Sequence, residues 1–169
     1  MDTMEEQVTQ ADIDARTRFR RAVSLFATGI AVVTVEGEQV GSVHGMTINS
    51  FTSISLDPPT VMISLKPGRT HRLISEHGRY GVSILHDGQE GHSAQFSGRP
   101  SADLMPEFEV RNHIPVLRSS LAWFACEVIE RVEVHDHTLF IAKVVACEGT
   151  DGSPLVFFAS RYHRQKFWI

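Results

Sequence analysis

The apolar residues of this chain fall mostly in short runs, either rich in β-branched residues or alternating with polar ones, which is typical of β-strands. Residues 30–35 form one β-branched run. Residues 121–134 and 137–148 form two longer runs, and the His135-Asp136 pair between them predicts a hairpin. The pattern predicts further strands over residues 39–47, 50–56, 60–65, 80–85 and 155–158.

Fewer segments show the period of a helix. Apolar residues three and four positions apart predict an amphipathic helix over residues 17–28, with Gly29 at its C-terminus. Two shorter helices are predicted over residues 70–77 and 88–96. The remaining segments are a loose tail over residues 1–15, a long excursion over 97–115 that covers part of a barrel or a partner subunit, and a polar tail over 161–164. The aromatic residues predicted to lie in the core are Phe19, Phe26, Trp123 and Phe124.

Many short strands with few helices predict a mainly β fold, a closed or nearly closed antiparallel barrel with peripheral helices. Residues 16–169 are expected to form one domain after the tail of residues 1–15. Strands do not alternate with long helices, and no G-x-G-x-x-G motif opens a helix after a strand. A nicotinamide cofactor would therefore bind without a Rossmann unit.

Composition excludes several classes of partner. The chain has 169 residues and a formal net charge of -4, which argues against a nucleic-acid partner and gives no attraction to anionic membranes. No apolar run reaches membrane-spanning length, and the polar, acidic start does not resemble a secretion signal, so we expect a cytoplasmic protein. Cys126 and Cys147 are then expected to be a reduced, buried pair and not a metal site.

Residues 41–59 are the segment with the most chemical potential. They are crowded with neutral hydrogen-bonding side chains: Ser42, Thr47, Asn49, Ser50, Thr52, Ser53 and Ser55. Such groups suit the edge of a planar, amide-bearing ring such as a flavin, which offers donors and acceptors. A Ser/Thr-rich solvent face of a sheet would give the same pattern, so from the residues alone both interpretations stay open. No G-x-S-x-G elbow supports a hydrolase.

The order of the motifs adds a resemblance. Residues 49–59 read N-S-F-T-S-I-S-L-D-P-P, and the similarity extends over residues 26–34, 45–59, 80–85, 93–96, 136–141 and 154–158, ending near Tyr162. These segments resemble, in the same order, the flavin reductase component of two-component flavin-dependent monooxygenases. The similarity spans nearly the whole chain after the tail.

This resemblance implies an FMN-binding split β-barrel, usually a homodimer, that transfers a hydride from NADH or NADPH to FMN or FAD. The reduced flavin would then serve a separate monooxygenase. The residues that match flavin-binding positions of the family are Val43, His44, Gly45, Met46, Thr47, Asn49, Ser50, Ser64, Leu65, Lys66, Arg69, Thr70, Gln95 and Phe96. Those that match its NAD(P)H-binding positions are His137, Arg161 and Tyr162. No side chain is assigned a catalytic role, because the cofactors carry the bond chemistry.

Several alternatives stay open at this point. His135 replaces the glycine of the family's Gly-Asp-His turn, and it could share a strand face with His137 and chelate a metal, although no third ligand is evident. His137 could also be a plain turn residue, and Lys66 and Arg69 could belong to an ordinary solvated loop. At the level of function, the alternatives are a flavin-storage protein, or an enzyme that keeps its flavin and reduces another acceptor such as a quinone or a metal chelate.

Overall fold

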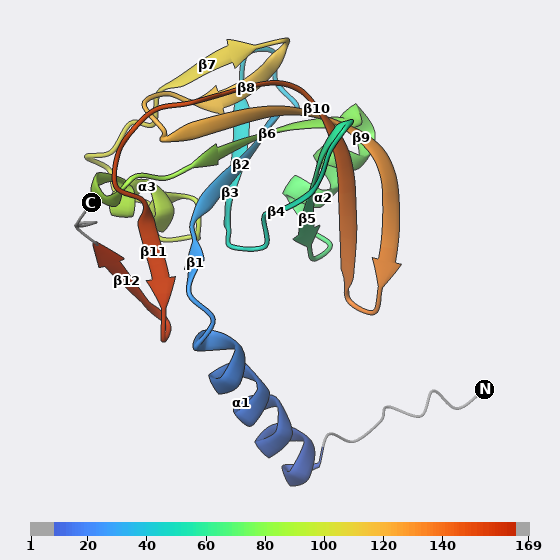
Figure 1. Cartoon of the computed structure of the whole chain (residues 1–169), viewed down its shortest axis with the longest axis vertical. Coiled ribbons are helices and arrows are strands. Elements are labelled where there is room, and N and C mark those ends of the chain that lie inside the picture. Colours follow the sequence, from blue (N-terminus) through green and yellow to red (C-terminus); the bar gives the residue numbers. More distant parts are fainter. Residues whose placement is uncertain (1–8, 165–169) are drawn as a thin grey trace.

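A seven-stranded antiparallel sheet forms the body of the protein in the computed structural model, which describes residues 9–164 (Figure 1). Its strand order is β3-β2-β6-β9-β10-β5-β4. The strands are β2 (Ala31–Glu36), β3 (Val43–Ile48), β4 (Thr52–Leu56), β5 (Pro59–Leu65), β6 (Arg79–Ile84), β9 (Ala122–Val134) and β10 (His137–Gly149). The two edge strands, β3 and β4, are consecutive in the chain, so residues 49–51 join the two edges of the sheet. The prediction of a mainly β, antiparallel fold is confirmed.

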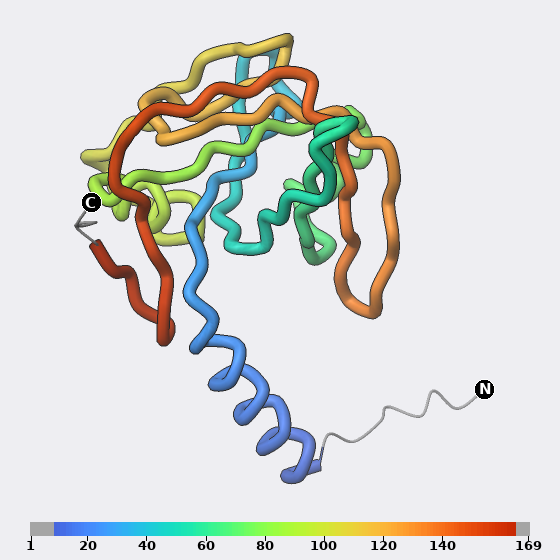
Figure 2. The backbone as a smooth tube through the Cα atoms, viewed as in Figure 1, coloured from blue at the N-terminus to red at the C-terminus, as the bar shows by residue number. Residues whose placement is uncertain are grey.

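Two smaller sheets complete the strands. β1 (Thr28–Gly29), β11 (Leu155–Phe158) and β12 (Arg161–Arg164) form one, and β7 (Phe108–Arg111) and β8 (Ile114–Leu117) form a hairpin. Both differ from the prediction, because the excursion over residues 97–115 contains part of a hairpin and the polar tail over 161–164 is a strand. Figure 2 follows the chain from the first helix into β1 and, at its end, through β11 and β12 close to that segment.

Three helices accompany the sheets: α1 (Gln10–Ser24), α2 (Arg69–His77) and α3 (Glu90–Gln95), the last preceded by the 3₁₀ turn η1 (Asp87–Gln89). α1 begins earlier than predicted, so residues 10–15 are helical, and residues 1–8 of the predicted tail lie outside the described part. A capping box starts this helix: the Thr9 N–H donates to Asp12 Oδ2 at 3.0 Å, and the Asp12 N–H donates to Thr9 Oγ1 at 3.2 Å. The helix ends before Leu25, and Gly29 belongs to β1 instead of capping it.

The buried side chains form two clusters on either side of β2. Val33 and Val35 join the main cluster, to which α2 contributes Leu73 and Ile74, while Val32 joins the second cluster. Burial of both faces explains why apolar residues occupy consecutive positions of β2, Ala31 to Val33, instead of alternating with polar ones. The prediction that Phe19 and Phe26 lie in the core is wrong: they are 71% and 75% exposed. Phe19 lies on α1, which projects from the body and has no buried residue (Figure 1), and Phe26 lies in the segment between α1 and β1.

The two cysteines are free, but they are not a buried pair. Cys126 is buried on β9 and Cys147 is exposed near the end of β10. Burial raises the pKa of the Cys126 thiol to about 12, so this group stays protonated at neutral pH. Within residues 9–164, no helix has the length and apolar character needed to cross a membrane.

Candidate functional site

The edge strand β3 places the predicted flavin-binding residues on two different faces. A Cβ atom added to Gly45 would lie 2.8 Å from two ring atoms of Phe96, and the Thr47 Oγ1 donates to the Ser93 carbonyl at 2.8 Å, so both positions face α3 and its end. Met46 instead packs against the main core. Side chains of neighbouring β3 residues therefore cannot line a single surface, and a ligand here would meet mainly backbone.

The two residues at the start of β3 extend the site in other directions. Val43 lines a separate hollow beside Arg79 and Pro115. His44 is half-buried, and burial, with a smaller contribution from Arg69, lowers the pKa of its imidazole. His44 is accordingly a neutral donor or acceptor at neutral pH and adds no positive charge.

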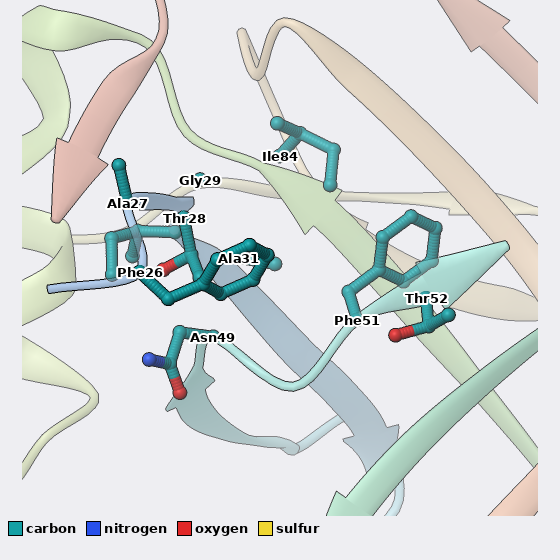
Figure 3. Close-up of a pocket in the computed structure, with 10 residues that line it drawn as sticks. Phe26, Ala27, Thr28, Gly29, Ala31, Asn49, Phe51, Thr52 and Ile84 are labelled. Atoms are coloured by element: carbon teal, nitrogen blue, oxygen red, sulfur yellow. The ribbon is translucent and has the colours of Figure 1, made fainter. Parts of the chain in front are cut away.

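A pocket of about 270 Å³ opens where the end of β3 meets the segment that follows α1 (Figure 3). It is lined by residues 26–31 together with Asn49, Phe51, Thr52 and Ile84. Of the residues predicted to bind flavin, Asn49 is the one that lines this pocket. Residues 26–34 carry part of the family resemblance, but the sequence predicts none of them in the site, because their contribution depends on the pairing of β1 with β11.

The chemistry of this pocket fits a flavin ring. The Thr28 hydroxyl is buried and has no hydrogen-bond partner within residues 9–164, and Asn49 is an exposed residue of the pocket lining (Figure 3). A buried hydroxyl without a partner costs roughly 1–3 kcal/mol, which a bound ring edge with donors and acceptors would recover. The volume suits one part of a flavin, since pockets that enclose a whole ligand of that size are typically larger.

Other predicted flavin-binding residues are engaged within the protein. The Ser50 hydroxyl donates to the Ser64 carbonyl at 3.0 Å and accepts from the Ser64 N–H at 3.1 Å, which ties the loop after β3 to β5. Leu65 is 1% exposed and Thr70 is 3% exposed, so neither residue offers a ligand much accessible surface in this structure. The Gln95 side-chain oxygen accepts from the Ser101 N–H at 2.9 Å and fixes the chain after α3.

Separate substitutions should distinguish the two roles. Asn49→Ala is expected to weaken flavin binding roughly fivefold, the effect of one lost hydrogen bond of about 1 kcal/mol, with the free energy of unfolding unchanged. Ser50→Ala is expected to lower that free energy by about 1 kcal/mol, because the contacts to Ser64 are lost. Titration with FMN and urea denaturation of both variants measure the two effects. Equal stability loss in both variants would contradict the assignment of Asn49 to the pocket.

The predicted phosphate-binding cations each meet an acidic residue. Lys66 Nζ lies 2.8 Å from Asp136 Oδ2, and Arg69 pairs with Glu38. Asp136 Oδ1 also lies 2.7 Å from His137 Nδ1, so one carboxylate holds Lys66 and His137 together. Hydrogen bonds from Lys66, the larger effect, and from His137 lower the pKa of Asp136 to about 2. This carboxylate is therefore ionised at neutral pH.

The turn between β9 and β10 forms with His135 at the position where the family's turn has glycine. His135 adopts a φ of 53°, the left-handed region that favours glycine, and β9 and β10 pair directly on either side of a two-residue loop. Asp136 and His137 thus keep a regular turn. Within the described residues no group of three His, Cys, Asp or Glu side chains could hold a metal, so the pair His135 and His137 gains no third ligand there.

The residues predicted to bind nicotinamide lie in two places. The Tyr162 hydroxyl is 2.8 Å from Ser93 Oγ, and through Ser93 it connects to Thr47 on β3. Arg161 is exposed at the start of β12. The β9–β10 turn with His137 and the strand β12 lie on opposite sides of the body in Figure 1. One chain therefore does not bring His137 and Tyr162 into one contact surface.

Comparison with known proteins agrees with this architecture. The model of the flavin reductase like domain matches residues 23–166. The chain is 59% identical over 156 residues to the NADH-dependent flavin reductase StyB of Pseudomonas fluorescens, an alignment that covers 90% of this chain and 91% of that protein. The chain therefore belongs to the flavin reductase-like family, and the resemblance predicted from the sequence is confirmed.

Solved structures show the same relationship. The styrene monooxygenase flavin reductase SMOB from Pseudomonas putida S12 is 56% identical with a TM-score of 0.83, over 89% of this chain and 99% of that one. The NADH:FAD oxidoreductase SgcE6 of Streptomyces globisporus, solved with NAD and FAD fragments, is 30% identical with a TM-score of 0.81, over 95% of this chain and 97% of that one.

Proposed function

We propose that this protein reduces a flavin, FMN or FAD, with NADH as the electron donor. The pocket between residues 26–31 and Asn49 carries the proposal, because its unpaired Thr28 hydroxyl calls for a polar ligand edge. Family membership supplies the identity of that ligand, and the relatives StyB and SgcE6 are both named for NADH-dependent flavin chemistry.

The reaction moves a hydride from C4 of the nicotinamide to N5 of the flavin, which gives NAD⁺ and reduced flavin. The protein's part is to bind and orient both molecules, since alignment at near-attack distance supplies much of the rate of such a transfer. Thr28 and Asn49 would hold the polar edge of the flavin, and Lys66 and Arg69 would meet its phosphate end. His137, Arg161 and Tyr162 would meet NADH, a role that a raised KM for NADH in His137→Ala would support.

We further propose that the reduced flavin leaves for a separate monooxygenase. The support is the name of the relative SMOB, a flavin reductase of a styrene monooxygenase. In this role flavin is a substrate, and the exposure of Lys66 and Arg69 suits a phosphate end that enters and leaves.

The two free cysteines suit the reducing cytoplasm that the sequence predicts.

A steady-state assay tests the proposed function. Purified protein is mixed with NADH and increasing FMN or FAD, and loss of nicotinamide absorbance is followed. The proposed function requires a rate that saturates with free flavin far above the enzyme concentration. A yellow protein that does not oxidise NADH would instead indicate flavin storage. A rate that needs only stoichiometric flavin and an added quinone or metal chelate would indicate a tightly bound flavin.

We also propose a homodimer built on a split barrel. The short connection over residues 49–51 between the two edge strands, β3 and β4, supports the barrel part of this proposal. The apolar side chains of Phe19 and Val23 on α1 and Ile129 on β9 are exposed, and a second copy would cover them. A dimer would also allow His137 of one copy and Tyr162 of the other to share a site. Sedimentation should then give twice the chain mass of 18.9 kDa, and a monomer would contradict the proposal.

A further inference from the structure

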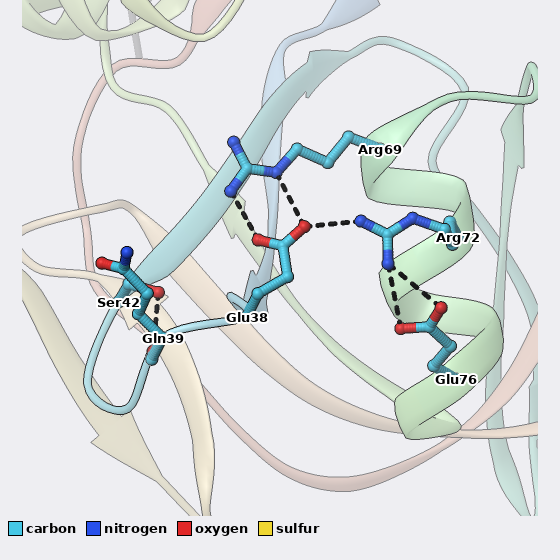
Figure 4. Close-up of polar contacts among 6 residues, drawn as sticks. All are labelled: Glu38, Gln39, Ser42, Arg69, Arg72 and Glu76. Atoms are coloured by element: carbon cyan, nitrogen blue, oxygen red, sulfur yellow. Dashed lines mark hydrogen bonds and ion pairs between the residues drawn. The ribbon is translucent and has the colours of Figure 1, made fainter.

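Glu38, in the loop between β2 and β3, lies against the arginines that begin α2 (Figure 4). Arg69 Nε donates to Glu38 Oε1 at 3.3 Å and Arg69 Nη2 donates to Oε2 at 2.5 Å. Arg72 Nη2 also donates to Glu38 Oε1, while its Nη1 donates to Glu76 at 3.1 Å. Sequence reasoning did not single out Glu38, because it is 31 residues from Arg69 and lies in a predicted turn.

The Glu38 contact occupies the part of Arg69 that would bind phosphate. A guanidinium presents parallel N–H groups that match a carboxylate or a phosphate in the same bidentate geometry. Glu38 accepts from Nε and Nη2 of Arg69, so a phosphate cannot use that edge until the carboxylate moves away. Hydrogen bonds from Arg69, and to a smaller extent from Arg72, lower the pKa of Glu38 to about 2, so this competing carboxylate is ionised at neutral pH.

The loop that carries Glu38 is held by its own contacts. The Gly37 N–H donates to the Ser42 carbonyl at 2.8 Å, and the Ser42 N–H donates to the Gln39 carbonyl at 2.9 Å. The Ser42 hydroxyl donates to the Gln39 carbonyl at 2.7 Å (Figure 4). These bonds form the turn without the arginines. The backbone position of Glu38 therefore does not depend on its ion pair, and removing its charge should leave the loop folded.

We propose that Glu38 sets the affinity for phosphorylated flavins by competing with their phosphate for Arg69. The inference rests on the proposed function, which assigns Arg69 to the phosphate end of the flavin. In this proposal the Glu38 carboxylate lowers the affinity of the site for FMN or FAD. The lower affinity allows the flavin to exchange as a substrate. Riboflavin, which has the same ring and no phosphate, should not sense Glu38.

The variant Glu38→Gln tests this competition. Its affinity for FMN is expected to rise roughly fivefold, the size of a well-formed exposed ion pair, while its affinity for riboflavin stays unchanged. Glu76→Gln is the matched control: it removes the same charge from a residue that pairs with Arg72 and not with Arg69, and FMN affinity should change much less. Dissociation constants are measured directly by fluorescence titration with FMN and with riboflavin.

Three results would overturn the proposal. The first is an FMN affinity that stays the same in Glu38→Gln. The second is a joint rise of FMN and riboflavin affinity, which would indicate a change in the ring site. A lower KM for NADH with unchanged flavin binding would assign Arg69 to the nicotinamide substrate. Because the test measures binding, it is separate from the proposed activity: a wild-type protein that binds FMN but never oxidises NADH would refute the activity and leave the competition measurable.

Discussion

Replacing Gly81 with alanine is expected to lower the free energy of unfolding by roughly 3 kcal/mol. An added Cβ atom at Gly81 on β6 would lie 2.2 Å from the Pro115 carbonyl oxygen and 2.6 Å from Thr34 Oγ1. The Thr34 hydroxyl donates to that same carbonyl, so β2, β6 and β8 meet at this point. The obstructing oxygen is backbone, and it cannot move without disturbing the packing of β8 on the sheet. Urea denaturation followed by tryptophan fluorescence measures the change.

Gly149→Ala is the control for this prediction. Gly149 is the last residue of β10, which belongs to the same large sheet as β6. A Cβ atom added there would lie 3.7 Å from Ala122 Cβ, which is an ordinary contact. Its stability is expected to match that of the wild-type protein within about 0.5 kcal/mol. Equal stability of Gly81→Ala and Gly149→Ala would show that β8 does not approach β6 as closely as the structure has it.

Gly45→Val is expected to reduce the affinity for FMN by about tenfold or more, which corresponds to about 1.4 kcal/mol, and to cost roughly 1–3 kcal/mol of stability. The new side chain would enter the space of the Phe96 ring, whose atoms lie 2.8 Å from an added Cβ. Moving Phe96 would also disturb the bond from the Thr47 N–H to the Phe96 carbonyl at 3.0 Å. That bond joins β3 to the end of α3 beside the proposed flavin site. Equilibrium titration with FMN and urea denaturation measure the two effects.

A double variant separates crowding from binding. Gly45→Val combined with Phe96→Ala removes the ring that the valine would meet, so much of the stability is expected to return. Flavin affinity should remain low, because Phe96 matches a family position that closes over the flavin. If Gly45→Val alone binds FMN as the wild-type protein does, the flavin does not depend on this contact between β3 and α3.

The strands with a strong local pattern were predictable from the sequence. β2 is a run of β-branched residues, and the β9–β10 hairpin follows from two long apolar runs around His135-Asp136. The start of α1 was missed because residues 10–15 carry little apolar periodicity, and a capping box at Thr9 begins the helix instead. The β7–β8 hairpin was missed because Pro115 interrupts its second strand, which is stabilised by burial of Ile114, Val116 and Leu117 beneath the sheet.

The candidate site was predictable only in part, and for a physical reason. Asn49 lies in a hydroxyl-rich string that the sequence displays directly, and the structure places it in the pocket. Thr28 has no such local signal, since its position follows from the pairing of β1 with β11, which lies more than a hundred residues away. The partners of the predicted cations, Glu38 and Asp136, likewise depend on tertiary contacts that residue spacing does not reveal.

The turn at His135 shows what fixes the geometry beside Lys66. A side chain in the left-handed region costs roughly 1 kcal/mol more than glycine there, so the local sequence at His135 does not favour the backbone conformation that this residue adopts. The long pairing of β9 with β10 imposes the shape from both sides, and Phe140 and Ala142 anchor that pairing in the core. Asp136 and His137 thus inherit their places from the sheet. A residue other than glycine can therefore occupy the corner while the carboxylate and the imidazole beside it keep their positions.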